Sequence, residues 1–233
     1  MTTPVARFLD LWLDAHDVPA VARFWGQALG MTPAPADHDA VRLEGHHSWD
    51  ALWVRQAPPH ADGCTIHVDI AVDHITPLLA QGARMVDASS YPWVVLEGPE
   101  GCEICAFPRD PHSRRRLIDL IMECADPPTA APWWAELLGA GYHVSADGDY
   151  AWVEPVPGAP FDSMVFARQE ELPAGDCCRL RPRLATHDLG ALYAAGATRV
   201  EHAGPGELLL AGPAGNEFFV QVSDLVVRPD DED

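Results

Sequence analysis

Apolar and polar residues alternate along residues 7–15 (RFLDLWLDA), which predicts a strand with Asp10, Trp12 and Asp14 on one face. Asp17 then precedes an apolar segment with helical spacing that stops at Gly30, so we expect a helix through Leu29. The pattern after this helix predicts strands near 39–44, 51–57 and 64–72, a short helix over 75–81, and strands near 84–87, 93–97 and 102–107. The first half of the chain thus reads as a strand, a helix and further strands, twice.

The second half of the chain repeats the first. The turn Gly98-Pro-Glu-Gly101 recurs as Gly212-Pro-Ala-Gly215 at an offset of 114, and residues 7–17 fall on 116–126 at an offset of 109. A register that holds over most of the chain indicates a duplication. We expect four modules in two tandem units, 1–109 and 117–224, joined by a linker at 110–116 and followed by an acidic tail at 225–233.

Net charge and amino-acid composition exclude several classes of function. The 233 residues carry a net charge of -20, with 35 acidic residues against 15 basic ones, and every basic residue is arginine. Such a surface repels nucleic acid and anionic membranes, and the lack of lysine excludes Schiff-base chemistry. The sequence shows no secretory signal, membrane-spanning run or disulfide framework, so it predicts a cytoplasmic protein. Abundant Ala, Gly, Pro and Arg without lysine indicates a bacterial source, and we expect a small-molecule ligand and a monomer or homodimer.

Three stretches carry a resemblance to a known family. "IHVDIAVDH", "ARFWGQALGM" and the hairpin "WVVLEGPEGCEICAF", with its second copy "LLLAGPAGNEFFV", resemble the vicinal oxygen chelate superfamily, in its glyoxalase-like, bleomycin resistance-like branch. The resemblance implies an α+β fold in which paired βαβββ modules form cupped mixed sheets, so four modules form two tandem domains. It also implies that the ligand or metal lies in the cup and that each hairpin supplies a wall strand.

The resemblance implies where metal ligands would lie. The matching positions are Asp10, the Trp53/Arg55 region, His67 and Cys105 in the first unit; in the second they are Asp119, the Phe166/Arg168 region, Arg181 and Phe219. Such a site needs three or four converging His or carboxylate groups. The guanidinium of Arg181 would repel a metal ion, and the first unit offers at most Asp10, His67 and Cys105. We therefore expect no metal cofactor.

The alternation of side chains along the strands of the first unit predicts a ligand-binding cup formed by this unit alone. It would combine Asp10, Trp12, Trp53, Arg55, His67, Asp69, Glu103 and Cys105. His67 with Asp69 could act as a catalytic acid or base, or Glu103 could pin His67 as a structural pair. In the second unit Arg181 could bind an anionic ligand, or form ion pairs with Asp119, Glu123 and Glu217. Cys102 and Cys105 lie three apart on a strand, so they face opposite sides.

Two classes of function remain open at this point. The first is binding or sequestration of a small, partly aromatic organic molecule without a metal, of the drug-resistance kind. The second is an enzyme, a lyase, isomerase or cyclase that uses His67 with Asp69 or Asp10, with or without a metal. Sequence alone does not decide between them.

Overall fold

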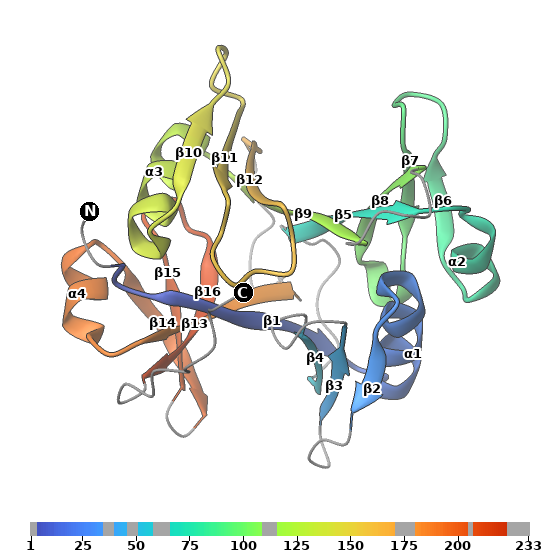
Figure 1. Cartoon of the computed structure of the whole chain (residues 1–233), viewed down its shortest axis with the longest axis horizontal. Coiled ribbons are helices and arrows are strands. Elements are labelled where there is room, and N and C mark those ends of the chain that lie inside the picture. Colours follow the sequence, from blue (N-terminus) through green and yellow to red (C-terminus); the bar gives the residue numbers. More distant parts are fainter. Residues whose placement is uncertain are drawn as a thin grey trace, which may run out of the picture.

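Four modules make up the chain in the computed structural model, which describes residues 4–34, 40–45, 51–57, 66–108, 116–170, 180–204 and 207–222 (Figure 1). Module 1 holds β1 (Arg7–Ala15), α1 (Val18–Leu29), β2 (Thr32–Ala34), β3 (Ala40–Glu44) and β4 (Ala51–Gln56). Module 2 holds β5 (Ile66–Val72), α2 (Thr76–Ala80), β6 (Arg84–Asp87), β7 (Val94–Glu97), the 3-10 turn η1 (Pro99–Gly101) and β8 (Glu103–Pro108).

The second half repeats this order. Module 3 holds β9 (Leu117–Cys124), α3 (Pro127–Leu138), β10 (Gly141–Val144), β11 (Tyr150–Glu154) and β12 (Ser163–Arg168). Module 4 holds β13 (Leu180–Thr186), α4 (Leu189–Ala194), β14 (Thr198–Gly204), β15 (Glu207–Ala211) and β16 (Glu217–Val222). The predicted α+β class and the four βαβββ modules are confirmed, and the short strand β2 is an element that the sequence pattern did not predict.

Two eight-stranded mixed sheets carry the fold, and each combines modules from both halves of the chain. The first has the order β14-β15-β16-β13-β1-β4-β3-β2, and the second has the order β10-β11-β12-β9-β5-β8-β7-β6. β1 pairs antiparallel with β13, and β5 pairs antiparallel with β9. Module 1 therefore shares a sheet with module 4, and module 2 shares the other with module 3.

This pairing corrects the prediction of a cup built from the first unit alone. Asp10 and Trp12 lie on β1 in the first sheet, whereas His67 and Cys105 lie on β5 and β8 in the second. The alternation of side chains within a strand fixes which face they occupy, but it does not specify which strand lies beside it. Because the four modules have similar sequence patterns, these patterns are compatible with several ways of pairing the modules into sheets.

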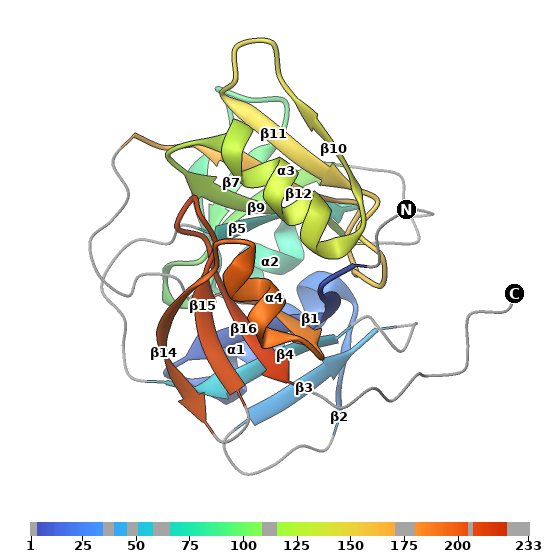
Figure 2. The same ribbon diagram turned by 90° about the vertical axis from the view of Figure 1, so that its left-hand side faces the viewer.

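The helices and the apolar faces of both sheets form one core. α1 packs on β2, β3 and β4 and also reaches β5 and η1, while α3 packs on β10, β11 and β12 and reaches β1 (Figures 1 and 2). Leu11, Leu13 and Ile70 point into this core together with Phe24 and Trp134. The opposite face of each sheet turns away from the core, and these two faces carry the polar side chains.

Caps and turns fix the first helix of each half as predicted. Asp17 accepts a hydrogen bond from the N–H of Ala20, and Gly30 ends α1 with a left-handed φ of 69°. Asp126 and Gly139 cap α3 in the same way. The left-handed conformation suits glycine because it has no Cβ.

The two repeated hairpin turns each hold a strand of the other sheet. The carboxylate of Glu100 accepts hydrogen bonds from the N–H groups of His16 and Asp17, at the end of β1. The amide of Asn216, after the second turn, donates to the carbonyl of Glu123 on β9. The hairpins therefore supply wall strands, as predicted, and also join the two sheets.

Some predictions fall on other parts of the chain. Arg116 is the described residue of the predicted linker 110–116, and the tail 225–233 lies outside the described residues. Within the described ranges, no helix is long and apolar enough to cross a membrane.

Candidate functional site

Each sheet presents one polar face, and we name these faces cup A and cup B. Cup A is lined by Asp10, Trp12 and Asp14 of β1, Trp53 and Arg55 of β4, Arg181 and Arg183 of β13, and Glu217 and Phe219 of β16. Cup B is lined by His67 and Asp69 of β5, Glu103 and Cys105 of β8, Asp119, Ile121 and Glu123 of β9, and Ser163, Val165 and Ala167 of β12. The strand registers of the two cups correspond position by position.

Asp10 anchors the first of two ion-pair groups in cup A. Nε and Nη2 of Arg183 lie 2.8 Å and 2.6 Å from the two carboxylate oxygens of Asp10, and the indole N–H of Trp53 donates to Oδ2 at 3.2 Å. Burial raises the pKa of Asp10, and these hydrogen bonds oppose the rise. A bidentate guanidinium of this kind occupies both oxygens of the carboxylate.

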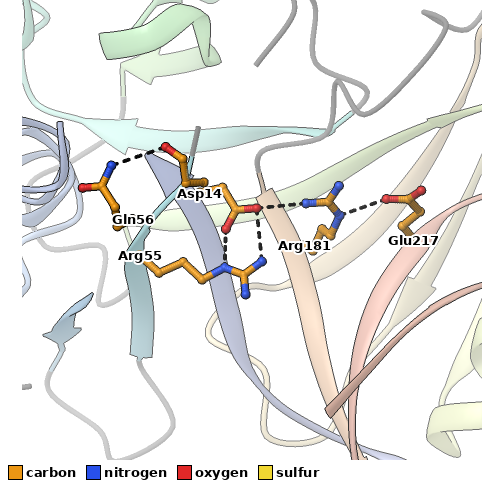
Figure 3. A network of polar contacts seen from close by, with 6 residues as sticks. Asp14, Arg55, Gln56, Arg181 and Glu217 are labelled. Atoms are coloured by element: carbon orange, nitrogen blue, oxygen red, sulfur yellow. Dashed lines mark hydrogen bonds and ion pairs between the residues drawn. The ribbon is translucent and has the colours of Figure 1, made fainter. Parts of the chain in front are cut away.

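Asp14 anchors the second group, which Figure 3 shows. Arg55 pairs with the Asp14 carboxylate, and Nη1 of Arg181 lies 3.2 Å from Oδ2 of the same group. Nε of Arg181 donates in turn to Glu217 at 2.9 Å. The side chain of Arg181 is only 2% exposed, so a chain of alternating charges crosses the floor of the cup.

Aromatic rings fill the space that remains between these charges. The guanidinium of Arg55 lies 4.7 Å from the Trp12 ring centre and 4.4 Å from that of Phe219, and the two rings lie 5.1 Å apart. Arg183 covers Trp12 at 4.7 Å. Cation–π contacts at these distances are attractive. Cup A is therefore occupied by its own side chains.

Cup B carries smaller or acidic residues at the positions that fill cup A. On β9 and β12 the strand registers place Ile121 where cup A has Trp12, Val165 where it has Trp53, and Ala167 where it has Arg55. On β5 they place His67 at the position of Arg181 and Asp69 at the position of Arg183. On β8 they place Cys105 at the position of Phe219. The three carboxylates of cup A keep acidic counterparts in Asp119, Glu123 and Glu103. The duplicated positions thus retain the acids and carry other residue types where cup A has its arginines and aromatic rings.

Two of the cup B carboxylates face each other across the central strand pair. Asp69 of β5 is the direct partner of Asp119 of β9. The N–H and hydroxyl of Ser163 donate to Oδ1 of Asp119 at 3.2 Å and 2.6 Å, which fixes that carboxylate. Like charges at directly opposed positions repel. The hydrogen bonds from Ser163 tie the Asp119 carboxylate to β12.

His67 lies beside this pair with a neutral ring. Burial lowers the pKa of His67 to about 4, so at pH 7 the imidazole can accept a proton or a hydrogen bond. Its Nδ1 lies 4.0 Å from Oε1 of Glu103, a carboxylate whose pKa is raised by burial although half of its side chain is exposed. The separation exceeds hydrogen-bonding distance, so the predicted His67–Glu103 partners are neighbours without a direct bond.

Cys105 completes the polar group at the cup B floor. Burial, with the charges of Asp69 and Glu103, raises the pKa of the Cys105 thiol to about 12, and the thiol bonds to the Asp69 carboxylate. The thiol is therefore protonated at neutral pH and acts as a hydrogen-bond donor. Cys102, three residues earlier, points into the core, which confirms that the two cysteines face opposite sides.

Aromatic side chains form one wall of cup B. Trp93 bonds to the sulfur of Cys105 and stacks on Phe107 with ring centres 4.9 Å apart. Tyr91 stacks on the other side of Trp93 at 5.0 Å. A stacked ladder beside carboxylates and a neutral imidazole offers both apolar contact and directed hydrogen bonds to a ligand.

The donor groups of the two cups differ in their fit to a metal ion. In cup A the carboxylates of Asp10 and Asp14 bind guanidinium groups, so these residues do not fit a metal site. In cup B the ligand atoms of His67, Asp69 and Cys105 all lie within 4.8 Å of one another. Imidazole, carboxylate and thiolate suit Zn²⁺, but the thiol would first have to lose a strongly held proton.

The structure thus divides the predicted site residues between the two cups. The predicted catalytic residues His67 and Asp69 lie together in cup B, with Glu103, Cys105 and Asp119; the other predicted residues Asp10, Trp12, Trp53, Arg55, Arg181 and Glu217 lie in cup A. Asp10 and His67 therefore lie in different sheets, and so do Asp119 and Arg181. Arg181 does form an ion pair with Glu217, as one alternative predicted.

Sequence reasoning missed three small residues of cup B. Ser163, Val165 and Ala167 face the cup, whereas the predicted Phe166 is buried in the core and Arg168 bonds to Asp149 outside it. The predicted equivalence of Phe166 and Arg168 to Trp53 and Arg55 was wrong by one residue. A one-residue shift in a strand places every side chain on the other face.

Comparisons with known proteins agree with this architecture. Residues 10–107 and 119–221 each match the family described as the glyoxalase-like domain. Glyoxalase I from Zea mays superposes with a TM-score of 0.63 at 12% identity, over 93% of this chain and 92% of that one. A putative dioxygenase from Bacillus subtilis subsp. subtilis str. 168 superposes with a TM-score of 0.61 at 8% identity, over 95% and 86%. No curated protein matches the sequence. At such identities the structural likeness shows the fold and leaves the reaction open.

Proposed function

This chain belongs to the glyoxalase-like domain family, and on that premise we propose that it binds a small, partly aromatic organic molecule in cup B. Cup A serves the fold in this proposal, because its floor is closed by its own ion pairs and rings. The proposal keeps the ligand class that the sequence suggests and moves the site from a cup within one half of the chain to the cup that modules 2 and 3 share.

One observation carries the proposal: the exchange of residues between equivalent positions of the two cups. Trp53 and Arg55 in cup A correspond to Val165 and Ala167 in cup B, and Phe219 corresponds to Cys105. Each exchange removes side-chain volume from cup B while the strand framework stays the same. Space beside an aromatic wall and a few directed polar groups is what a small-molecule site usually offers.

The polar groups of cup B suit recognition without a metal. The carboxylates and the neutral imidazole of His67 are acceptors, while the Cys105 thiol and the indole N–H of Trp93 already donate to Asp69 and to the Cys105 sulfur. The proposal therefore needs no cofactor. If Zn²⁺ were bound by His67, Asp69 and Cys105, it would act as a Lewis acid on a ligand oxygen. Elemental analysis of the purified protein decides this point: stoichiometric zinc that is lost in Cys105→Ser would replace the metal-free proposal.

Acid–base catalysis is a second candidate, favoured by the neutral imidazole of His67. A buried imidazole near a carboxylate can take up a proton from a substrate. If cup B only binds its ligand, His67→Ala weakens affinity modestly and removes no turnover. If His67 is a general base, the same variant lowers the rate by about 10²–10⁴ with the fold intact.

Ligand retention tests the binding proposal directly. Small molecules released from the purified protein are identified by untargeted mass spectrometry, for the wild type and for Val165→Trp. This variant places in cup B the residue type that cup A has at the equivalent position, so we expect the retained molecule to disappear.

Val200→Trp is the matched control, because Val200 is 46% exposed on β14 of the other sheet. The control should retain the wild-type molecule. Equal retention in wild type and Val165→Trp would exclude cup B as the site.

A further inference from the structure

Strand β11 adds aromatic side chains to the rim of cup B. In its register with β12, Tyr150 lies opposite Ala167 and Trp152 lies opposite Val165. Ala167 and Val165 face cup B, and residues directly opposite each other on paired strands share a face, so both rings stand on the cup face of β11. The large side chains that are absent from the floor strand β12 are therefore present one strand farther out.

Cup A has the opposite arrangement on its corresponding strands. There the small residue Ala40 on β3 lies opposite the large residue Arg55 on β4. The position of Ala40 corresponds to that of Tyr150, and the position of Arg55 corresponds to that of Ala167. The large member of this pair thus lies on the floor strand in cup A and on the outer strand in cup B.

Tyr150 is the aromatic residue of this rim whose ring is available to a ligand. Trp152 donates its indole N–H to Glu154 at 3.0 Å and stacks on His143 with ring centres 5.3 Å apart. Tyr150 is 54% exposed, and its side chain makes no ring contact or hydrogen bond within the described residues. An exposed tyrosine offers a ligand a flat apolar face.

A cavity of about 670 Å³ lies beside this ring, at the end of β11 and β12. We name it the end cavity, and its wall is formed by Asp149, Tyr150, Arg168, Gln169 and Glu170. Its volume lies within the range of small-molecule sites. The end cavity adjoins cup B because Tyr150 belongs both to its wall and to the cup face of β11.

Arg168 holds an oriented guanidinium in the wall of the end cavity. Its Nε donates to Asp149 at 2.9 Å, its Nη1 donates to the carbonyl of Ala125 at 2.8 Å, and its Nη2 donates to the carbonyl of Gly148 at 2.9 Å. These bonds use three of the five N–H groups of the guanidinium, which leaves one N–H on each Nη as a donor to a ligand. Asp149 pairs with the positive charge, and Glu170 adds a carboxylate to the wall.

We propose that the end cavity is the outer part of the cup B site and binds an uncharged aromatic ring that carries a carbonyl oxygen, as in an aryl ketone. The ring stacks on Tyr150, and the carbonyl oxygen accepts the remaining N–H groups of Arg168. A neutral oxygen suits this wall better than a carboxylate, because Asp149, Glu170 and the net charge of -20 repel anions. The inference rests on the proposed function and names the chemical class of the outer end of its ligand.

Three small molecules test this chemistry. Acetophenone has the aromatic ring and the neutral carbonyl, benzoate replaces the ketone with an anion, and cyclohexyl methyl ketone replaces the aromatic ring with a saturated one. Their affinities for the full, isotope-labelled chain are measured by chemical-shift titration, which also shows which backbone amides respond. We expect acetophenone to bind at least about tenfold more tightly than benzoate and about three- to tenfold more tightly than cyclohexyl methyl ketone. The amides of Tyr150 and Gln169 should shift.

A substitution at Tyr150 locates the ring. Tyr150→Leu keeps an apolar side chain without the aromatic face, so it should weaken acetophenone about three- to tenfold. Tyr142→Leu is the matched control, because Tyr142 is 49% exposed on β10 but lies opposite the buried Val153, on the other face of the same hairpin. The control should leave the affinity within about twofold.

A substitution at Arg168 locates the carbonyl. Arg168→Lys keeps the charge and removes the planar guanidinium, so it should weaken acetophenone at least about fivefold. Arg84→Lys, at an exposed arginine paired with Glu97 on β7, is its control and should bind like the wild type. Circular dichroism and the thermal midpoint check the fold of each variant. Tyr150→Leu changes an exposed side chain, so it tests the inference even if Arg168→Lys does not fold.

Four outcomes would overturn the inference: benzoate or cyclohexyl methyl ketone binds as tightly as acetophenone, Tyr150→Leu binds acetophenone like the wild type, the shifted amides lie away from the end cavity, or acetophenone does not bind. The retention experiment separates these outcomes from failure of the proposed function. A molecule that is retained by the wild type and by Tyr150→Leu but lost in Val165→Trp would keep cup B as the site and reject the end cavity.

Discussion

His67 and Arg181 occupy equivalent positions on β5 and β13, yet they have different roles. Arg181 is 2% exposed and lies between Asp14 and Glu217, so its charge is neutralised on both sides. His67 keeps a neutral ring at the floor of cup B. A single exchange at one register position therefore separates a structural ion pair from a group able to bind or transfer a proton.

The lowered pKa of His67 makes stability depend on pH. The folded protein binds a proton at His67 only near pH 4, whereas the unfolded chain binds it near pH 6.5. The unfolded state therefore holds more protons between these values, and the His67 contribution to the free energy of unfolding is lost as pH falls from about 6.5 to 4. Its full size is roughly 3 kcal/mol.

Urea unfolding at pH 7.5, 5.5 and 4.5 measures this contribution. We expect the wild type to lose stability relative to His67→Gln as the pH falls through this window. His74→Gln, at an exposed position, should run parallel to the wild type. Parallel profiles for His67→Gln as well would contradict the neutral ring.

At the scale of elements, the repeated hairpin has two tasks. Its second strand lies in the sheet wall, as β8 in one copy and β16 in the other, and its turn holds the other sheet. Gly101 and Gly215 take left-handed φ values of 82° and 85° at equivalent places in the two turns. The turn geometry is thus repeated, while the side chain that bonds to the other sheet is Glu100 in the first copy and Asn216 in the second.

Glu100→Ala should loosen the join between the sheets. The carboxylate accepts from the N–H groups of His16 and Asp17 at 3.0 Å and 2.7 Å, and both lose their acceptor in the variant. We expect a loss of about 1–2 kcal/mol in the free energy of unfolding by urea. Glu136→Ala, on the exposed face of α3, controls for loss of a negative charge and should change stability by less than about 0.5 kcal/mol.

At the scale of the whole molecule, the pairing of modules concentrates arginine in one cup. Because β1 pairs with β13, Arg181 and Arg183 meet the carboxylates of β1, which are Asp10 and Asp14. β9 then pairs with β5, and Asp119 meets Asp69. If each half of the chain formed its own sheet, β9 would lie beside β13, where arginines alternate along the strand. The observed pairing therefore brings the arginines of β13 to the aspartates of β1 in one cup and sets Asp69 opposite Asp119 in the other.

A charge exchange tests this pairing. Asp10→Arg places two guanidinium groups opposite each other on β1 and β13, and Arg183→Asp places two carboxylates there. Each single variant should lose about 3–5 kcal/mol in the free energy of unfolding, because it leaves a buried charge opposed. The double variant restores the pair and should recover at least half of the summed loss. Additive losses would show that the two residues do not face each other.

The sequence by itself determined the repeat, the caps of the first helix and most strands and helices of the first half, with β2 as the exception, because these depend on side-chain alternation and local turn chemistry. It also determined which face of β1, β5 and β8 carries the polar residues. The position of β12 was wrong by one residue, so Ser163, Val165 and Ala167 were missed, since no local signal marks a single-residue shift in a short strand.

Only the tertiary structure decided which modules share a sheet. Strand pairing between similar modules depends on contacts between residues far apart in the sequence, such as Asp10 with Arg183, and each module carries the same alternation whatever its neighbour is. For that reason the sequence placed these residues on polar strand faces but assembled them in the wrong combination. The fold divided them into a cup closed by its own ion pairs and a cup whose acids face each other.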